Sequence, residues 1–444
     1  MAEPSPFVPS VARAASRSRR TLGPRALRLV VAFGVALAGC PEPAPSHDGG
    51  DAGIDGGERG DGGRDGGGLD GASACAPACG ECERCEGSRC ASIGAARAVR
   101  GVFTGWYHTV ALDSEGAAWS WGANNEGQLG LGHELDVSVA TSIGAEPASR
   151  ADGGSRHTCL VAADGSLFCA GVNVHGQLGV GDSVDRSLFV QVGDATDWID
   201  VACGGLHTCG LRADGSIWCW GSNPLGQLGL GDEADDRLTP VRVAGEGWVS
   251  LSAKTRSTCA IDGGGALFCW GDNSDGQLGV GDRDARRSPL AVDPSRRFES
   301  IGTGALHTCA IDDAGALLCW GANAMGQLGL GDRERRLTPA VVDGGSWAMV
   351  DGGFAHTCAI RGDGALLCWG ANDAGQLGLG DREPRLTPAQ VGTDTDWIAV
   401  TLGATHSCGL HADGALECWG DGARGQLGRA VEAGEVPGTA CFAP

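Results

Sequence analysis

The sequence predicts an all-β chain whose main part is a seven-bladed β-propeller. The motif Gly-Gln-Leu-Gly occurs seven times, at intervals of 49 or 50 residues. The copies begin at Gly127, Gly176, Gly226, Gly276, Gly326, Gly375 and Gly425. A period of this size marks units that stack on one another to share a core. No long segment has a 3.6-residue apolar period, and turn signals recur about every ten residues, which is typical of four-stranded blades.

A β-hairpin is expected in every repeat, and residues 198–243 show it most clearly. The segment His207 to Trp220 holds two apolar runs around the loop Ala213-Asp214-Gly215. Glycine at the third loop position permits the positive φ that a type I turn with a bulge requires. The same glycine recurs as Gly116, Gly165, Gly265, Gly315, Gly364 and Gly414. Stretches such as 198–201 and 241–243 supply the other strands.

Six repeats place a tryptophan before a glycine, and these side chains are expected to form the core between blades. They are Trp121, Trp220, Trp270, Trp320, Trp369 and Trp419. The second repeat has Ala170 instead, which predicts a thinner contact at one junction. In each Gly-Gln-Leu-Gly we expect the glycine and leucine to serve a tight turn and packing, and the glutamine to satisfy backbone groups of its loop.

The combined pattern H-T-x-x-L-x-x-D-G-x-x-x-x-W-G-x-N-x-x-G-Q-L-G-x-G-D resembles the repeat of the regulator of chromosome condensation family. The resemblance covers about residues 94–444 and implies a seven-bladed propeller. The last repeat departs from the pattern at Gly422 and has a short exit after Arg429, and the fourth has Ser257 where six others have histidine.

Six repeats carry Cys-x9-Cys across the hairpin, and a three-residue loop places the two cysteines opposite each other. We therefore expect six disulfides within blades, which would require an oxidising compartment. The first repeat has lost both members together, to Val110 and Ser120. The expected bonds join Cys159 with Cys169, Cys209 with Cys219, Cys259 with Cys269, Cys309 with Cys319, Cys358 with Cys368, and Cys408 with Cys418. Buried free thiols are the alternative.

Further cysteines form a cluster in residues 75–93, which is expected to be a disulfide-rich segment rather than a metal site. The cluster holds Cys75, Cys79, Cys82, Cys85 and Cys90. Five is an odd number, so Cys441 in the last strand is expected to pair with one of them, with Cys90 as the candidate, and so to close the ring. Cys203 then remains as a buried, unpaired thiol.

The first 39 residues have the features of a bacterial lipoprotein signal peptide. Six arginines precede the short apolar run 29–38, which ends in Leu37-Ala38-Gly39-Cys40. This run is too short to span a bilayer, and Cys40 would be the lipidated first residue after cleavage. Residues 40–74 form a Gly/Asp-rich tether, and the propeller occupies 94–444. The expected location is therefore the bacterial cell envelope, with lipid attachment to the outer membrane on its periplasmic or cell-surface side.

The charge of the chain excludes one class of partner. The formal net charge is −22, and removal of residues 1–39, with six Arg and one Glu, would bring it to about −27. Such a surface should repel nucleic acid. We therefore do not transfer chromatin binding from the resembled family, and export argues against nucleotide exchange on a small GTPase.

Recurrent histidines and aspartates raise the question of a metal or catalytic site. The histidines are His108, His157, His207, His307, His356 and His406. Equivalent residues on separate blades lie too far apart to share an ion, so we expect hydrogen bonds inside each blade. Asp182, Asp232, Asp282, Asp332 and Asp381 are expected to cap loops. The chain has one tyrosine and no motif for a catalytic nucleophile, a phosphate or zinc, so we expect neither an enzyme nor a cofactor.

The two residues before each recurrent histidine vary, and repeat symmetry places all seven pairs at one end of the ring. Aromatic and arginine side chains there have the composition of a binding hot spot. The candidate partner-binding residues are Trp106, Tyr107, Arg156, Leu206, Arg256, Leu306 and Phe354. Packing in the axial channel is the alternative. Two further variable sets, the pair before each Gly-Gln-Leu-Gly and charged loops such as 333–336, are interpreted as solvated surface.

The sequence thus indicates a monomeric, envelope-anchored propeller that binds a protein as scaffold, receptor or inhibitor. A carbohydrate-binding or glycan-hydrolysing propeller and a structural envelope protein without a specific ligand are the alternatives. Exposed Trp beside carboxylates would favour glycans, whereas a wider patch of aromatic residues and Arg favours a protein.

Overall fold

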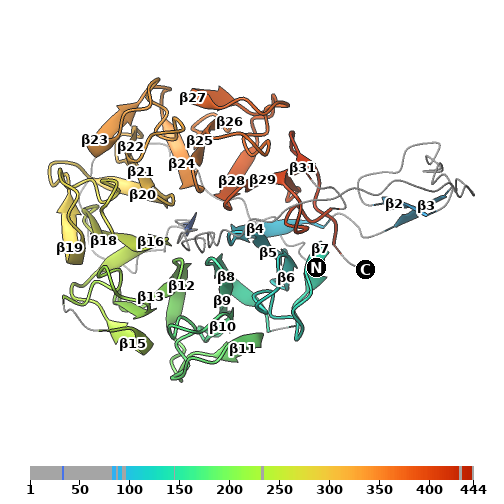
Figure 1. The fold of residues 1–444 in the computed structure, drawn as a ribbon, viewed down its shortest axis with the longest axis horizontal. Coiled ribbons are helices and arrows are strands. Elements are labelled where there is room, and N and C mark those ends of the chain that lie inside the picture. The colour runs from blue at the N-terminus through green and yellow to red at the C-terminus, as the bar shows by residue number, and fades with distance from the viewer. Residues whose placement is uncertain are drawn as a thin grey trace, which may run out of the picture. The chain divides into compact units, whose positions relative to one another are not determined.

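Seven blades, each built from four consecutive strands, are arranged as a β-propeller in a computed structural model of the chain (Figure 1). The structure describes residues 33–34, 83–86, 89–92, 97–144, 146–231, 235–429 and 433–442. Among these residues every regular element is a strand. No helix of the described part is long and apolar enough to cross a membrane.

The blades follow one another along the chain, and each contains four consecutive strands. Blade 1 holds β4 (Val99–Thr104), β5 (His108–Asp113), β6 (Ala118–Gly122) and β7 (Val137–Ser142). Blade 2 holds β8 (Ala148–Gly153), β9 (His157–Ala162), β10 (Leu167–Gly171) and β11 (Arg186–Gln191). Blade 3 holds β12 (Trp198–Cys203), β13 (His207–Arg212), β14 (Ile217–Gly221) and β15 (Arg237–Arg242). Blade 4 holds β16 (Trp248–Lys254), β17 (Ser257–Asp262), β18 (Leu267–Gly271) and β19 (Arg286–Val292).

The remaining blades repeat this order, and the last one ends in a shorter strand. Blade 5 holds β20 (Phe298–Thr303), β21 (His307–Asp312), β22 (Leu317–Gly321) and β23 (Arg336–Val342). Blade 6 holds β24 (Trp347–Gly352), β25 (His356–Arg361), β26 (Leu366–Gly370) and β27 (Arg385–Gln390). Blade 7 holds β28 (Trp397–Leu402), β29 (His406–His411), β30 (Leu416–Asp421) and β31 (Ala433–Gly434). The first strand of each blade lies nearest the axis, and neighbouring strands within the blades are antiparallel (Figure 1).

The expected hairpin is present in blade 3. Gly215 has a φ of 78° and donates its N–H to the carbonyl of Arg212, as a tight turn requires. The register places Cys209 opposite Cys219, and these two residues form a disulfide.

The other five predicted disulfides are also present, each across the hairpin of its own blade. In every case the two cysteines are direct register partners on the second and third strands. The bonds join Cys159 with Cys169, Cys259 with Cys269, Cys309 with Cys319, Cys358 with Cys368, and Cys408 with Cys418. The pairing within blades is thus confirmed, and the alternative of buried free thiols does not apply to these twelve residues.

Tryptophans fill the junctions between blades, as predicted. Trp220 of blade 3 is fully buried, and a Cβ added at Gly179 of blade 2 would lie only 2.6 Å from its Nε1 atom. A residue larger than glycine would therefore displace the indole. The same close approach recurs at Gly229, Gly279, Gly329, Gly378 and Gly428.

The junction between blades 1 and 2, where Ala170 replaces tryptophan, is not left thin. Phe189 of the outer strand β11 supplies a ring there, and a Cβ added at Gly130 would lie 2.1 Å from its Cε2 atom. The expectation of a thinner contact was wrong, because the missing aromatic group comes from a strand that sequence symmetry does not single out.

The chain end joins blade 7 to blade 1. Cys441 donates its N–H to Gly428 of blade 7 and accepts a hydrogen bond from the N–H of Ala140 in β7. Phe442 packs edge-on against Trp119 of blade 1, with ring centroids 5.4 Å apart. Cys441 is disulfide-bonded, and its partner lies outside the side chains that the structure describes. The end segment therefore joins blade 7 to blade 1, and the pairing of Cys441 with the cysteine cluster stays a prediction.

Three short strands precede the ring. β1 (Phe33–Gly34) pairs in parallel with β20, and β2 (Glu83–Glu86) pairs with β3 (Arg89–Ser92), where the register sets Cys85 opposite Cys90. Most of the expected signal peptide, Cys40, the tether and Cys75, Cys79 and Cys82 lie outside the described residues. Those expectations remain predictions.

Candidate functional site

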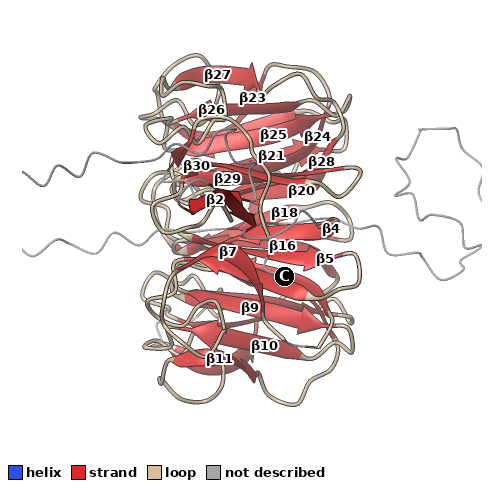
Figure 2. Cartoon of the chain, turned by 90° about the vertical axis from the view of Figure 1, so that its right-hand side faces the viewer, coloured by secondary structure: helices blue, strands red, loops and turns tan. Residues whose placement is uncertain are grey.

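All three variable sets of loops lie at the same end of the ring. In each blade the antiparallel strand order puts the loop before the recurrent histidine and the loop containing Gly-Gln-Leu-Gly at one end. We call this the His-loop end, and the opposite end, formed by the three-residue hairpin loops, the hairpin end. The edge-on view in Figure 2 shows loops gathered at the two sides of the stacked strands. The sets that we interpreted as ordinary surface are thus part of the candidate site.

The recurrent histidines are buried and connect one blade to the next. The Nε2 atom of His207 in blade 3 lies 2.9 Å from the hydroxyl oxygen of Thr258 in blade 4. That hydroxyl donates to the carbonyl of Gln227, so the histidine N–H must donate to the hydroxyl. The equivalent contacts are His108 with Thr158, His157 with Thr208, His307 with Thr357, His356 with Ser407, and His406 with Thr109. The expectation that each histidine bonds within its own blade was wrong, because its side-chain partner lies on the next blade.

Burial also fixes the charge state of these histidines. It lowers the pKa of His207 and of each of the other five to about 3, so all six are neutral near pH 7. Each is fully buried. They serve as neutral hydrogen-bond donors between blades and are not available to an outside ligand.

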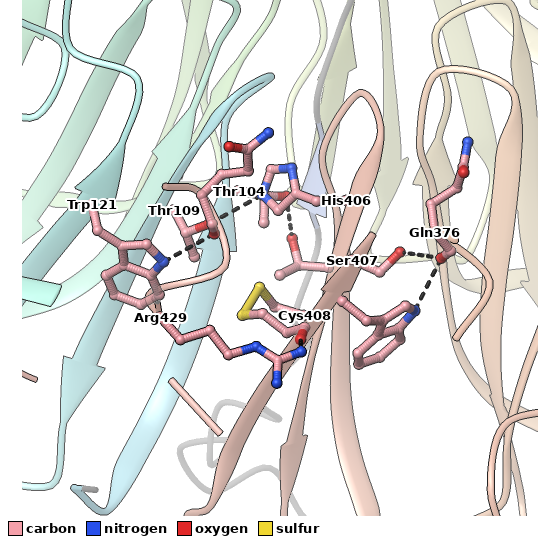
Figure 3. Close-up of a disulfide and its surroundings, with 12 residues drawn as sticks. Thr104, Thr109, Trp121, Gln376, His406, Ser407, Cys408 and Arg429 are labelled. Atoms are coloured by element: carbon pink, nitrogen blue, oxygen red, sulfur yellow. Dashed lines mark hydrogen bonds between the residues drawn. A yellow bond between two sulfur atoms is a disulfide. The ribbon is translucent and has the colours of Figure 1, made fainter. Parts of the chain in front are cut away.

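Each glutamine of Gly-Gln-Leu-Gly does two things. Its Oε1 atom accepts the N–H two residues earlier, as at Gln376 and Ala374 over 2.9 Å, which confirms the expected loop role. Its backbone carbonyl also accepts from the next blade: Gln376 receives Trp419 Nε1 and the hydroxyl of Ser407. Figure 3 shows this arrangement beside the closing junction, where His406 meets Thr109.

The predicted binding residues differ in their exposure at the His-loop end. Phe354 and Arg156 are exposed, whereas Tyr107, Leu206, Arg256 and Leu306 are half-buried. Trp106 is only 8% exposed and packs against Tyr107, with ring centroids 6.0 Å apart, and against Ala404. It supports the neighbouring tyrosine rather than presenting its own ring.

Tyr107 lies among charged residues of three blades. Burial and the nearby Asp421 carboxylate raise the pKa of its phenol, while Arg424 and Arg156 oppose this. Arg156 pairs with Glu126 at 3.2 Å, and Arg424 pairs with Asp136 at 3.2 Å. The tyrosine is therefore a neutral, half-buried group within a mixed charged surface.

A groove lies where the three variable sets meet, at the junction of blades 5 and 6. It has a volume of about 330 Å³. Leu306 and Phe354 come from the first set, Met325 from the second, and Arg333 and Arg335 from the third. Sequence reasoning chose the first set as the candidate site and interpreted the other two as solvated surface, because the repeat pattern does not show which loops of adjacent blades converge.

Blade 4 departs from the others at the same end. The other six blades have a glycine three residues before the histidine, and at Gly204 an added Cβ would lie 2.0 Å from the His207 ring. Blade 4 has Ser257 in place of the histidine, which leaves room for Lys254 at the glycine position. The next residue, Thr255, has a φ of 34°, a strained conformation for a β-branched side chain.

Lys254 is the only lysine of the chain, and it is fully buried beside two aspartates of other blades. Its Nζ atom lies 3.8 Å from Asp351 Oδ1 of blade 6. Burial lowers the pKa of the lysine, and the attraction of Asp351 and Asp152 opposes this effect. Asp152 also accepts the N–H of Cys203, and Asp351 that of Leu402. These inner-strand charges were not identified from the sequence, although a single lysine in 444 residues was a visible signal.

Cys203 is a buried free thiol, as predicted. Its sulfur lies within 4.8 Å of ligand atoms of His157 and Cys159. Cys159 is held in a disulfide with Cys169 and cannot act as a thiolate ligand. Burial raises the pKa of Cys203 well above its usual value, so this thiol is also protonated. The three residues therefore do not form a metal site in the oxidised protein.

Comparison with known proteins agrees with this architecture. The family model described as the RCC1-like domain matches residues 187–440, more than half of the chain. Models of the regulator of chromosome condensation (RCC1) repeat match residues 99–128, 152–177 and 115–161. No curated protein sequence matches the chain.

Solved structures share the fold at low sequence identity. Human WBSCR16 is 20% identical with a TM-score of 0.66, over 72% of this chain and 88% of that one. Prp20p from Saccharomyces cerevisiae, described with its binding properties to Gsp1p and histones, is 21% identical with a TM-score of 0.61, over 69% and 80%. Yeast RCC1 (Prp20) bound to Kap60 is 20% identical, also with a TM-score of 0.61, over 69% and 78%. With repeat models matching along the ring and the propeller present in the structure, the chain belongs to the RCC1-like repeat family.

Proposed function

We propose that this protein is an exported, lipid-anchored propeller that binds a partner protein through the His-loop end. The observation that carries the proposal is the convergence of all three variable loop sets at that end, while most of the residues that hold the blades together recur from repeat to repeat. A rigid framework with variable loops at one end suits recognition, since binding residues commonly lie on loops held by a scaffold.

The composition of the His-loop end supports a protein partner. Tyr107, Arg156 and Phe354 combine aromatic and guanidinium groups, which are enriched at protein interfaces. Ion pairs such as Arg156–Glu126 hold the exposed side chains in place and reduce the entropy lost on binding. The relatives of known structure that bind proteins support binding in general and do not name this partner.

A capture experiment tests the binding role. The full chain, oxidised and solubilised, is immobilised and exposed to envelope and secreted proteins of the source cells. The test variant carries Tyr107→Ala and Phe354→Ala. The matched control carries Val249→Ala and Ile398→Ala, two apolar residues that are 52% and 46% exposed and lie on strands near the hairpin end.

A protein retained by the parent and by the control, and lost by the test variant, is the expected result. Equal retention by the test variant and the parent would remove the His-loop end as the binding face. Retention of glycans alone would replace the protein-binding role by carbohydrate binding. Anchoring is tested separately: incorporation of an alkyne-labelled palmitate in bacteria should disappear in Cys40→Ala, and unchanged incorporation would contradict lipidation at Cys40.

A further inference from the structure

The groove at the junction of blades 5 and 6 has an apolar floor. Leu306 and Met325 are half-buried, and Phe354 is 43% exposed. Covering this exposed phenylalanine and the two large apolar groups beside it with another apolar side chain is favourable, by about 25 cal/mol per Å² of apolar surface buried. With a volume of about 330 Å³, the groove has room for one or two side chains.

The rim of the groove carries one positive charge that the ring does not neutralise. Arg335 is paired with Asp275, which also lines the groove. Arg333 is exposed, and its guanidinium donates to the backbone carbonyl of Ala324. Within the described part of the chain, Arg333 makes no ion pair, although the protein as a whole is strongly acidic.

The next junction, between blades 6 and 7, provides a comparison within the same molecule. The positions equivalent to Leu306, Met325 and Phe354 there are Ala355, Ala374 and Ala404. The position equivalent to Arg333 is Arg382, which is neutralised by Glu435 at 2.8 Å. The junction between blades 6 and 7 therefore has neither the large apolar floor nor an arginine without an ion pair.

We propose that this groove, as part of the binding face proposed above, takes a linear segment of the partner in which a large apolar side chain lies within two residues of an aspartate or glutamate. The apolar side chain covers Phe354 and Leu306, and the carboxylate pairs with the free guanidinium edge of Arg333. Charge complementarity selects the acidic neighbour, because a basic segment would meet an uncompensated positive charge.

A display library of random twelve-residue peptides, selected on the full-length protein, tests the groove directly. Peptides with an apolar residue close to an acidic one should be enriched, and their affinity should fall at least about tenfold on the Phe354→Ala protein. Selection on Arg333→Glu should instead enrich lysine or arginine beside the apolar residue. Arg382→Glu, at the equivalent position of the next junction, is the matched control and should leave the original peptides enriched.

Peptides that bind the Phe354→Ala protein as well as the parent would overturn the proposal. So would an unchanged acidic preference on Arg333→Glu, or the absence of any enriched peptide on the parent. Thermal unfolding midpoints within about 2 °C of the parent value establish that each variant is folded. The two proposals can also be separated by the capture experiment with single variants. If the Phe354→Ala protein still retains a partner that the Tyr107→Ala protein loses, protein binding at the His-loop end is supported and the role of the groove is contradicted.

Discussion

Lys254 of blade 4 and Asp351 of blade 6 meet inside the ring, with 3.8 Å between Nζ and Oδ1, and both are fully buried. Neither blade is a sequence neighbour of the other, and Asp152 of blade 2 adds a second carboxylate near the lysine. The buried ion pair ties the inner strands of blades 4 and 6 together. Removing the cation alone would leave buried negative charge, which is costly.

Replacing the lysine should therefore destabilise the ring. For Lys254→Met we expect the free energy of unfolding in urea to fall by about 3 kcal/mol, the cost of breaking a buried pair from one side. Adding Asp351→Asn to that variant should restore part of the loss, since it removes a carboxylate that has lost its partner. A Lys254→Met protein as stable as the parent would show that the pair is not structural.

The effects on stability of substitutions at Lys254 and Ser257 should be coupled. Ser257→His alone would place an imidazole against the lysine stem, because at the equivalent Gly204 even a Cβ would lie 2.0 Å from the ring of His207. We expect this single change to lower the thermal midpoint. The double change Lys254→Gly and Ser257→His should recover part of that loss through a new bond to Thr308. A double-mutant cycle measures the coupling, and additive effects would contradict it.

The buried histidines predict a loss of stability in acid. The pKa of each of the six is lowered to about 3 in the folded ring, against about 6.5 in the unfolded chain. Between these pH values the unfolded state binds more protons, so the contribution of each histidine is complete above about pH 6.5 and falls by about 1.4 kcal/mol per pH unit below it.

The carboxyls on the inner strands oppose this trend only in part. Burial raises the pKa of Asp152, Asp200 and Asp351, so the folded state protonates them first as the pH falls. Three carboxyls against six histidines leave a net loss of stability in acid. Urea midpoints measured from pH 7 to pH 4 should fall, and His207→Gln should reduce the slope by about one proton. A flat profile would show that the histidines are protonated in the folded state.

Phe189 should matter more than its position on an outer strand suggests. Phe189→Ala removes the ring that replaces tryptophan between blades 1 and 2, and we expect a loss of about 2–3 kcal/mol in unfolding free energy, less than for a fully buried aromatic group because Phe189 is only partly buried. The neighbouring Leu188 is 60% exposed, so Leu188→Ala should change stability by less than about 0.5 kcal/mol. Equal effects of the two changes would contradict the assignment.

Cys441 should remain attached to another peptide after digestion without reduction, because it is disulfide-bonded. Mass spectrometry of that peptide would identify its partner among the cysteines that precede the ring, with Cys90 as our candidate. Cys441→Ser should lower the free energy of unfolding by about 2–4 kcal/mol, since the bond closes a long loop. Recovery of Cys441 as a free thiol would contradict the prediction that a disulfide of Cys441 closes the ring.

The repeated parts of the protein followed from the sequence alone. The blade number follows from a motif that recurs every 49 or 50 residues. The hairpins around Gly215 and its equivalents and the six intrablade disulfides, such as the one between Cys209 and Cys219, depend on residues within about ten positions of each other. Such contacts recur in nearly every repeat, so periodicity is enough to find them. The end of the ring that carries variable residues also followed, because strands alternate in direction.

What only the tertiary structure decided are the contacts between repeats. The partner of each histidine, the replacement of a tryptophan by Phe189 and the groove lined by Phe354 and Met325 all join different blades. The pairing of Lys254 with Asp351 depends on the curvature that brings the inner strands of separate blades together around one axis. Periodicity predicts the contacts that recur inside each repeat. Contacts between residues that depart from the repeat pattern depend on how the closed ring brings separate blades together.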